Sequence, residues 1–253
     1  MSEKVVHAAD MLRAPVHKLG VNLTDEQFGL IDLYLAQLSQ YNEHTNLVSN
    51  ADPRVVMTEH VLDALSLVPF IERFKHDEHR HEPIISLVDV GSGAGLPGAI
   101  LAIALPYLDV TMLESVAKKV RFVETFITEA GLSNRARALA ARAEELGHQG
   151  RYRECFHLAT ARAVGSYELS AELCMPLLDL GGQFLAQKSL AQMDEASRTA
   201  VRVLPRLGGT VLASATLDSA ILEKERAVLI AAKVKHTGKQ YPRRWAQIKS
   251  EPL

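Results

Sequence analysis

The chain has 253 residues, of which 47% are hydrophobic and 23% charged, a composition typical of a globular protein. Lys and Arg number 28 against 30 Asp and Glu, which gives a formal net charge of −2. This balance disfavours a protein that coats nucleic acid through bulk positive charge, but it leaves room for a local basic patch. The two cysteines, Cys155 and Cys174, cannot form a disulfide framework or a four-thiolate zinc site, and we expect both to be buried thiols.

The sequence gives no sign of a membrane segment. Residues 1–7 contain no apolar signal core, and the aliphatic run at 99–105 is too short to span a bilayer. We therefore expect a cytoplasmic protein with no membrane partner.

The first part of the chain has a helical pattern. Thr24 and Gln27 fit a capping box, in which each side chain accepts a hydrogen bond from the other residue's backbone N–H. Asp52-Pro53 has the residue types that begin a further helix. Residues 75–83 are charged and end in proline, which is typical of a linker. The sequence thus predicts an N-terminal helical segment and linker over 1–83 and a second unit over 84–253.

Short aliphatic runs alternate with helical stretches after the linker. The run from Ile84 to Val90 is apolar apart from Ser86 and Asp89, as expected of a strand buried on both faces of a parallel sheet. Further strands are expected at 109–114, 136–141, 156–162 and 183–187, and the runs at 210–216 and 227–234 look like an antiparallel pair at a sheet edge. This order predicts an α/β fold with a doubly wound, mostly parallel sheet.

A glycine-rich loop follows the first expected strand, with the sequence Val-Asp-Val-Gly-Ser-Gly-Ala-Gly-Leu-Pro-Gly over 88–98. A dinucleotide-binding loop has the spacing G-x-G-x-x-G. Gly91, Gly93 and Gly95 instead have the spacing G-x-G-x-G, and Asp89 stands two residues before them. This arrangement favours a cofactor that bears a cation and a carboxylate, such as S-adenosylmethionine, whose cationic end Asp89 could face.

An acidic residue ends the second expected strand. Glu114 lies 23 residues after Gly91 and could accept hydrogen bonds from a ribose diol. Nicotinamide dinucleotides and S-adenosylmethionine both contain ribose, so Glu114 does not separate them. An acid at this place is also favoured by the dipole of the next helix alone.

The loop and several later stretches together resemble a known family. The residues are Tyr41-Asn42, Asn46-Leu47-Val48-Ser49, His60-Val61-Leu62-Asp63-Ala64-Leu65, the glycine loop with its Leu-Pro-Gly end, Lys118-Lys119-Val120-Arg121-Phe122, Arg142-Ala143-Glu144-Glu145, Ala161-Arg162-Ala163, Gln187-Lys188 and Tyr241-Pro242-Arg243-Arg244. The chain resembles the small-subunit ribosomal RNA guanine-N7 methyltransferases, also called glucose-inhibited division protein B. The resemblance covers residues 20–245, nearly the whole chain.

The resemblance implies a class I, Rossmann-like methyltransferase fold with S-adenosylmethionine as cofactor. The substrate it implies is N7 of a guanine in 16S ribosomal RNA within the small ribosomal subunit. Together, the loop pattern and the resemblance give the expected cofactor residues: Asp89, Gly91, Gly93, Gly95, Leu96, Glu114, Ser115, Val116, Ala143, Glu144 and Arg162.

Guanine N7 carries a free lone pair, so methyl transfer to it requires alignment and exclusion of water but no general base. In keeping with this, the sequence shows no triad or nucleophile elbow. The linker histidines His76, His79 and His81 have no fixed geometry, so we expect no metal site. Arg162 and Lys188, at the ends of the fourth and fifth expected strands, are candidates to orient the guanine or its phosphate.

Attraction to RNA must come from local charge. The segment between Arg226 and Ser250 contains no acid but six basic residues, Lys233, Lys235, Lys239, Arg243, Arg244 and Lys249, with Tyr241 and Trp245 placed among them to stack on bases. We expect Arg121, Lys188, Arg243 and Arg244 to contact RNA. Nothing in the sequence demands a dimer, so a monomer is expected.

The sequence departs from the family pattern in three places. Ser189 follows Lys188 where glycine is usual, Ala227-Val228 replaces a common His-Leu pair, and Trp245-Ala246-Gln247 lacks the usual glycine and proline. These departures leave open a non-enzymatic RNA-binding or ribosome-assembly module. A nicotinamide-dependent oxidoreductase on the same sheet is a second alternative, which the loop spacing and Asp89 oppose.

Overall fold

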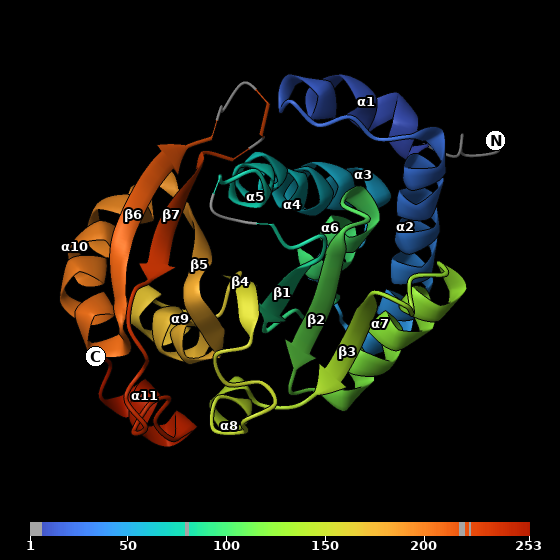
Figure 1. Cartoon of the computed structure of the whole chain (residues 1–253). Coiled ribbons are helices and arrows are strands. Elements are labelled where there is room, and N and C mark those ends of the chain that lie inside the picture. The colour runs from blue at the N-terminus through green and yellow to red at the C-terminus, as the bar shows by residue number, and fades with distance from the viewer. Residues whose placement is uncertain (1–6, 79–80, 218–220, 223) are drawn as a thin grey trace.

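A seven-stranded sheet forms the centre of the computed structural model, which describes residues 7–78, 81–217, 221–222 and 224–253 (Figure 1). The strand order is β3-β2-β1-β4-β5-β7-β6. The first five strands in this order run parallel to one another, and β7 runs antiparallel to both β5 and β6. The predicted doubly wound sheet with a terminal antiparallel pair is thus confirmed. The strands are β1 (Ile85–Val90), β2 (Leu108–Glu114), β3 (Ala136–Ala140), β4 (Phe156–Thr160), β5 (Leu178–Ser189), β6 (Gly209–Thr216) and β7 (Arg226–Lys233).

Helices cover both faces of this sheet. On one face lie α1 (Ala8–Lys18), α2 (Asp25–Thr45), α6 (Gly98–Ala104) and α7 (Ala117–Glu129), and on the other lie α8 (Ala143–Leu146), α9 (Tyr167–Cys174), α10 (Met193–Val203) and α11 (Trp245–Ser250). Consecutive residues of β1 alternate between the two hydrophobic cores, since Leu87 belongs to one and Val88 to the other. Because both faces are covered, the strand is apolar except at Ser86 and the buried Asp89.

The N-terminal helices pack into the same core as α6 and α7. The capping box at the start of α2 is confirmed, because Thr24 N–H donates to Gln27 Oε1 at 2.9 Å and Gln27 N–H donates to Thr24 Oγ1 at 3.2 Å. Gln27 also donates through Nε2 to the carbonyls of Ile103 and Ala104 at the end of α6. One side chain thus caps two helices and fixes α2 against the sheet layer.

The second expected helix is divided. It begins at Asp52, whose side chain accepts from Arg54 N–H, and runs through α3 (Pro53–Val56), a π-helical turn (Met57–Val61) and α4 (Leu62–Leu65), before α5 (Val68–Lys75). The π turn was not predicted from the sequence. Such turns insert an extra residue into a helix and often lie near functional residues, and here Asp63 lies two residues after the turn.

Two boundaries differ from those expected. Strand β5 begins at Leu178, five residues before the expected start at 183, because Leu178 pairs with Phe156 across a register shift. Strand β4 ends at Thr160, so Arg162 lies in the loop beyond it. No helix within the described ranges is long and apolar enough to cross a bilayer.

Candidate active site

The glycine loop leaves the carboxyl end of β1. Gly91, Gly93 and Gly95 have φ values of 71°, 59° and 83°, a backbone region that L side chains rarely adopt. A Cβ at Gly91 would lie 2.7 Å from Cγ2 of Val164, whereas a Cβ at Gly93 would have no atom of the described residues within 4 Å. The backbone at Gly93 is therefore open to a ligand, while Gly91 packs against the loop after β4.

Asp89 lies fully buried beneath this loop. Its Oδ2 accepts from the backbone N–H of Gly98 at 2.9 Å, and a Cβ at position 98 would crowd that oxygen, which explains the glycine at the end of the Leu-Pro-Gly motif. Its Oδ1 has no hydrogen-bond partner among the described residues. Burial raises the pKa of Asp89 to about 7, although the Gly98 N–H and the positive charge of Arg162 act in the opposite direction. A cationic group beside Oδ1 would therefore favour the charged carboxylate.

Glu114 ends β2 and joins two parts of the site. Its Oε2 accepts from Gly93 N–H at 3.0 Å, and its Oε1 accepts from Val116 N–H at 2.9 Å. The carboxylate thus holds the glycine loop beside the start of α7. Oε1 also accepts from Ser115 Oγ at 3.4 Å. Because a carboxylate oxygen has two lone pairs, Oε2 can accept a further hydrogen bond from a ligand hydroxyl.

A cavity of about 130 Å³ opens between these elements. Five of the predicted cofactor residues line it, namely Gly91, Glu114, Ser115, Ala143 and Glu144. Apolar side chains, among them Leu113, Val164 and Leu173, form much of the remaining wall. We call this the smaller cavity.

Other predicted cofactor residues lie around the smaller cavity without lining it. Asp89 lies beneath the loop and Gly95 lies within it. The Leu96 side chain is buried in the core beside α6. Val116 stands at the N-cap of α7 and is half-exposed. Trp245, which was predicted to stack on RNA, lines the smaller cavity instead.

A larger cavity of about 560 Å³ lies at the carboxyl ends of β4 and β5. Arg162 and Lys188, the two residues predicted to orient the guanine, both line it. The rest of its wall comes from α4, the loop after β4, α9, the end of β5, α10 and the first residue of β7: Asp63, Ala163, Gly165, Ser166, Tyr167, Glu168, Gln187, Ser189, Gln192, Glu195, Ala196, Thr199 and Arg226.

Residues 162–166 separate the two cavities. Arg162, Ala163, Gly165 and Ser166 line the larger one, whereas Val164 lines the smaller one. Lys188 donates from Nζ to the carbonyl of Gly165 at 2.9 Å, and burial lowers its pKa. The ammonium therefore lies against this separating segment, on the side of the larger cavity.

A buried carboxylate fixes the arginine of that segment. Asp63 accepts from Arg162 Nη1 at 3.1 Å through Oδ2, and from Arg226 Nε at 3.1 Å and Gln187 Nε2 at 2.9 Å through Oδ1. The π turn before Asp63 also brings the carbonyl of His60 within 3.4 Å of the same Arg162 nitrogen. The cluster joins α4 to the ends of β4, β5 and β7. Asp63, a residue of the N-terminal segment, is thus part of the wall of the larger cavity.

Sequence reasoning named Asp63 only within a stretch that resembles the family, and it gave no role to Arg226. The available signal was a charged residue inside an apolar helical stripe, since Asp63 stands among Val61, Ala64 and Leu65. A buried charge of this kind needs a partner, but the sequence does not say which cation supplies it.

The residues predicted to contact RNA differ in their surroundings. Arg121 on α7 and Arg244 before α11 are exposed. Arg243 donates from its backbone N–H and from Nε to Glu172 Oε1, at 2.9 and 2.8 Å, and from Nη2 to Oε2 at 2.7 Å. The Glu172 side chain is 1% exposed, so Arg243 forms a nearly buried ion pair that attaches the C-terminal segment to α9.

Two expectations about polar side chains were wrong. Lys233 does not belong to a basic surface, because its strand position points it inward, where it donates to Met175 O and Thr237 Oγ1 and pairs with Glu154. Cys155 was expected to be buried, but it follows a turn before β4 and is exposed, whereas Cys174 is buried. His79 lies outside the described residues. No group of three or more His, Cys, Asp or Glu that could hold a metal occurs in the part of the chain that the structure describes.

Comparison with known proteins shows the family to which the chain belongs. The family model described as rRNA small subunit methyltransferase G matches residues 27–207. The chain is 34% identical to the Ribosomal RNA small subunit methyltransferase G of Ligilactobacillus salivarius over 92% of this chain and 94% of that protein. It is 33% identical to the protein of the same name from Oceanobacillus iheyensis, over 99% and 98%.

Among solved structures, that of TrmN from Thermus thermophilus has a TM-score of 0.51 at 16% identity and covers 70% of this chain and 53% of that one, a likeness of fold alone. The family match disfavours both the oxidoreductase and the non-enzymatic RNA-binding module. The chain belongs to the rRNA small subunit methyltransferase G family and is an S-adenosylmethionine-dependent methyltransferase with a Rossmann-like fold.

Proposed function

We propose that this protein transfers the methyl group of S-adenosylmethionine to N7 of a guanine in 16S ribosomal RNA, with the small ribosomal subunit as substrate. The observation that carries the proposal is the pair of cavities on the two sides of residues 162–166. One has the groups that a nucleoside cofactor requires, and the other has room and polar groups for a purine. The relatives' names, which specify the small ribosomal subunit, support the RNA substrate.

The residues of the smaller cavity fit the cofactor. Glu114 presents carboxylate oxygens to ribose hydroxyls, and the apolar wall beside Ala143 suits an adenine ring. The unpartnered Oδ1 of Asp89, on the strand that leads into the loop, would favour a cationic end near Gly93, where the backbone is open. When bound, S-adenosylmethionine supplies a sulfonium methyl group that a lone pair can accept.

The larger cavity fits guanine. Gln187 and Tyr167 are nearly fully buried and line it, yet Gln187 Oε1 and the Tyr167 hydroxyl have no hydrogen-bond partner among the described residues. A guanine edge offers N–H donors at N1 and N2 and an acceptor at O6. Gln187 Oε1 would accept from the donors, and the Tyr167 hydroxyl and the Arg162 guanidinium would donate to O6. The orphaned groups would then be satisfied by substrate.

The residues have no proton to remove, because guanine N7 has a free lone pair. Their work is to bind the base, hold it in line with the methyl group and exclude water. The geometry of Arg162, fixed by Asp63, serves this alignment. His60 is not required as a base, and burial and the nearby Arg162 lower its pKa, which keeps its imidazole neutral.

Exposed cations around the site would bind the RNA backbone. Arg121 and Arg244 project from α7 and from the start of α11, and Lys239 and Lys249 are also exposed. Residues 84–253 would carry the methyltransferase unit, to which the segment 1–83 contributes Asp63. We further propose that the protein acts as a monomer in the cytoplasm and without a metal ion.

The test is methylation by the purified protein of small subunits, large subunits and bare 16S RNA, with labelled S-adenosylmethionine and nucleoside analysis of the product. The proposal predicts 7-methylguanosine, close to one per small subunit, and little label on the large subunit. Label on another nucleoside, or a preference for the large subunit, would contradict it.

A further inference from the structure

Trp245 is the single tryptophan of the chain and begins α11. Its side chain is half-buried and lines the smaller cavity together with Glu114, Ala143 and Glu144. Family resemblance gave no role to this position, since the tail after Arg244 departs from the usual pattern. A large aromatic face in a cavity suited to a nucleoside is a natural surface for a purine ring.

The C-terminal segment that carries Trp245 is firmly attached next to the cavity. Arg243, two residues before it, makes the bidentate ion pair with Glu172 of α9. Ile248, three residues after it, is fully buried in the core beneath α11. Trp245 is therefore flanked on both sides by anchored residues.

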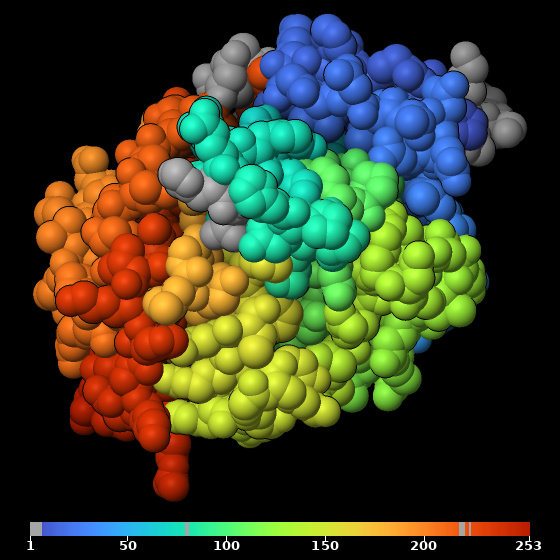
Figure 2. Space-filling model, viewed as in Figure 1, coloured from blue at the N-terminus to red at the C-terminus, as the bar shows by residue number. Residues whose placement is uncertain are grey.

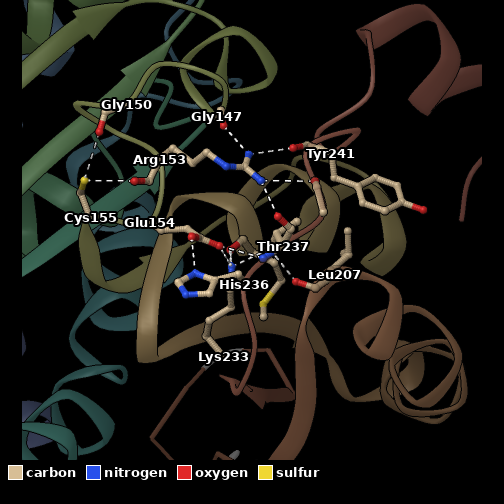
Figure 3. Close-up of polar contacts among 12 residues, drawn as sticks. Gly147, Gly150, Arg153, Glu154, Cys155, Leu207, Lys233, His236, Thr237 and Tyr241 are labelled. Carbon is tan, nitrogen blue, oxygen red and sulfur yellow. Dashed lines mark hydrogen bonds and ion pairs between the residues drawn. The ribbon is translucent and has the colours of Figure 1, made fainter.

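A second set of contacts holds the chain just before this segment (Figure 3). Arg153 donates from Nη1 to the carbonyls of Gly147 and Tyr241, and from Nη2 to those of Thr237 and Gly238. One guanidinium thereby connects the loop after α8 with the turn at 237–241. In the space-filling view the red C-terminal surface lies directly against the yellow-green surface around residue 150 (Figure 2).

Glu154, the next residue, reinforces the connection. It accepts from Thr237 N–H at 2.7 Å and pairs with the buried Lys233 ammonium at 3.2 Å and with His236 (Figure 3). These bonds satisfy a buried charge that would otherwise be costly. They also fix the end of β7 to the segment that precedes β4.

The tail also contacts the two residues that directly follow α8. A Cβ at Gly147, directly after α8, would lie 2.7 Å from Cδ and Cγ of Pro242, and His148 Nε2 is 2.7 Å from the Pro242 carbonyl. Helix α8 carries Ala143 and Glu144, which line the smaller cavity. The tail therefore packs against the end of the helix that supplies Ala143 and Glu144 to the cavity.

We propose that the Trp245 indole forms the outer wall of the adenosine part of the cofactor site and binds the adenine ring face to face, and that the anchored C-terminal segment is a structural part of that site. This inference rests on the proposed cofactor position in the smaller cavity. It assigns the C-terminal segment a role in cofactor binding, whereas its exposed cations Lys239, Arg244 and Lys249 remain free for RNA.

The single tryptophan makes the proposal directly measurable in the unmodified protein. S-adenosylhomocysteine should change the Trp245 fluorescence with saturation, and 5′-methylthioadenosine, which has the adenosine part alone, should do the same. Methionine should leave it unchanged. Calorimetry on the same samples measures binding independently of fluorescence.

Two variants separate a binding role from a structural one. Trp245→Ala should weaken the binding of S-adenosylhomocysteine roughly tenfold, within the range found when aromatic stacking on a base is removed. Trp245→Phe should retain most of the affinity. Ile248→Ala, in the same short helix, should lower thermal stability more and affinity less.

The outcomes distinguish this inference from the proposed function. Calorimetric binding of S-adenosylhomocysteine with unchanged fluorescence and an unaltered Kd in Trp245→Ala would overturn the inference and leave the methyltransferase proposal standing. An affinity loss in Ile248→Ala equal to that in Trp245→Ala would also overturn it. Absence of any S-adenosylhomocysteine binding would overturn both.

Discussion

Arg162 and Asp63 lie 99 positions apart in the sequence, yet Nη1 of the arginine is 3.1 Å from Oδ2 of the aspartate. The contact fixes the loop that separates the two cavities to a helix of the N-terminal segment. Because both side chains are largely buried, the guanidinium has one well-defined position beside the larger cavity. Four predictions follow from this and neighbouring contacts, and each can be checked on the purified protein.

Replacing Arg162 by alanine should reduce methyl transfer far more than stability. The guanidinium is the proposed donor to guanine O6, and loss of one such donor costs about 100-fold or more in rate. Asp63 would keep Arg226 and Gln187 as partners, so its charge stays compensated. Single-turnover methylation and urea unfolding of the same variant measure the two effects.

Arg226→Ala is the matched control for that substitution, because Arg226 also binds Asp63 at 3.1 Å and lines the same cavity, but it lies away from the separating segment. It should destabilise the protein to a similar degree and reduce turnover much less. Equal loss of activity in both variants would show that the arginines matter only through the fold.

The pH dependence of cofactor binding should report Asp89. Burial raises its pKa to about 7, above the ordinary value of 3.8, so the folded protein holds this proton where the unfolded chain has lost it. The corresponding stability is complete below the unfolded pKa and is lost as the pH rises through about 7. S-adenosylmethionine affinity should change in the opposite sense and increase between about pH 6 and pH 8, as the carboxylate forms.

Asp89→Asn tests that assignment, since asparagine can still accept from Gly98 N–H. The variant should show a flatter affinity profile in calorimetric titrations and, without ligand, should unfold at higher urea than the parent protein at alkaline pH. A wild-type profile that stays flat across the same interval would refute the role of Asp89.

Gly93→Ala should weaken binding of the cofactor at least about tenfold. The residue has φ 59° and no neighbour within 4 Å among the described residues, so an added methyl meets open space in the protein but reaches into the ligand's place. The cost in stability should be about 1 kcal/mol, from the backbone conformation. Gly93→Val, which is bulkier, should abolish binding while the fold remains.

Gly131→Ala provides the matched control for this strain. Gly131 follows α7, has φ 68° and likewise has no described atom within 4 Å of an added Cβ, but it lies at neither cavity. It should lose the same stability as Gly93→Ala and keep its cofactor affinity. If both variants bind the cofactor equally well, the loop does not contact it at Gly93.

The two adjacent arginines of the tail should behave differently. Arg243→Ala removes one partner of a buried pair and should lower the free energy of unfolding by about 3 kcal/mol. Arg244→Ala should leave stability unchanged, weaken binding to small subunits and reduce the salt dependence of binding by about one phosphate contact. Urea unfolding and filter binding at several salt concentrations check both.

Lys18→Ala, an exposed cation on α1 at the opposite end of the molecule in Figure 1, is the control for Arg244. It should change neither stability nor the salt slope. A similar loss of RNA affinity in Lys18→Ala would indicate diffuse charge attraction without a defined surface.

Local features were predictable because neighbouring residues determine them. The capping box depends on Thr24 and Gln27 alone, and the glycine loop depends on backbone conformations that only its own residues adopt readily. The buried strands could be predicted from short, mostly apolar runs, and these runs in turn predicted the sheet and its terminal antiparallel pair. Even β5 was identified, although its beginning was not, because that depends on pairing across to Phe156.

Contacts between distant segments could not be read in this way. Arg243 was expected to face RNA because it stands in a basic stretch, but its partner Glu172 is 71 positions earlier and lies on a helix against which the tail packs. Lys233 was misplaced for a related reason, since its burial depends on Glu154 and on a strand register that composition does not determine. In both cases the charge was visible in the sequence and its compensating partner was not.

The most direct measurement is a co-crystal structure with S-adenosylhomocysteine and guanosine 5′-monophosphate. The two-cavity arrangement predicts the adenosine of the first ligand beside Glu114 in the smaller cavity, and the guanine of the second in the larger cavity beside Gln187, with residues 162–166 between them. Adenosine in the larger cavity, or an empty smaller cavity at saturating ligand, would contradict it.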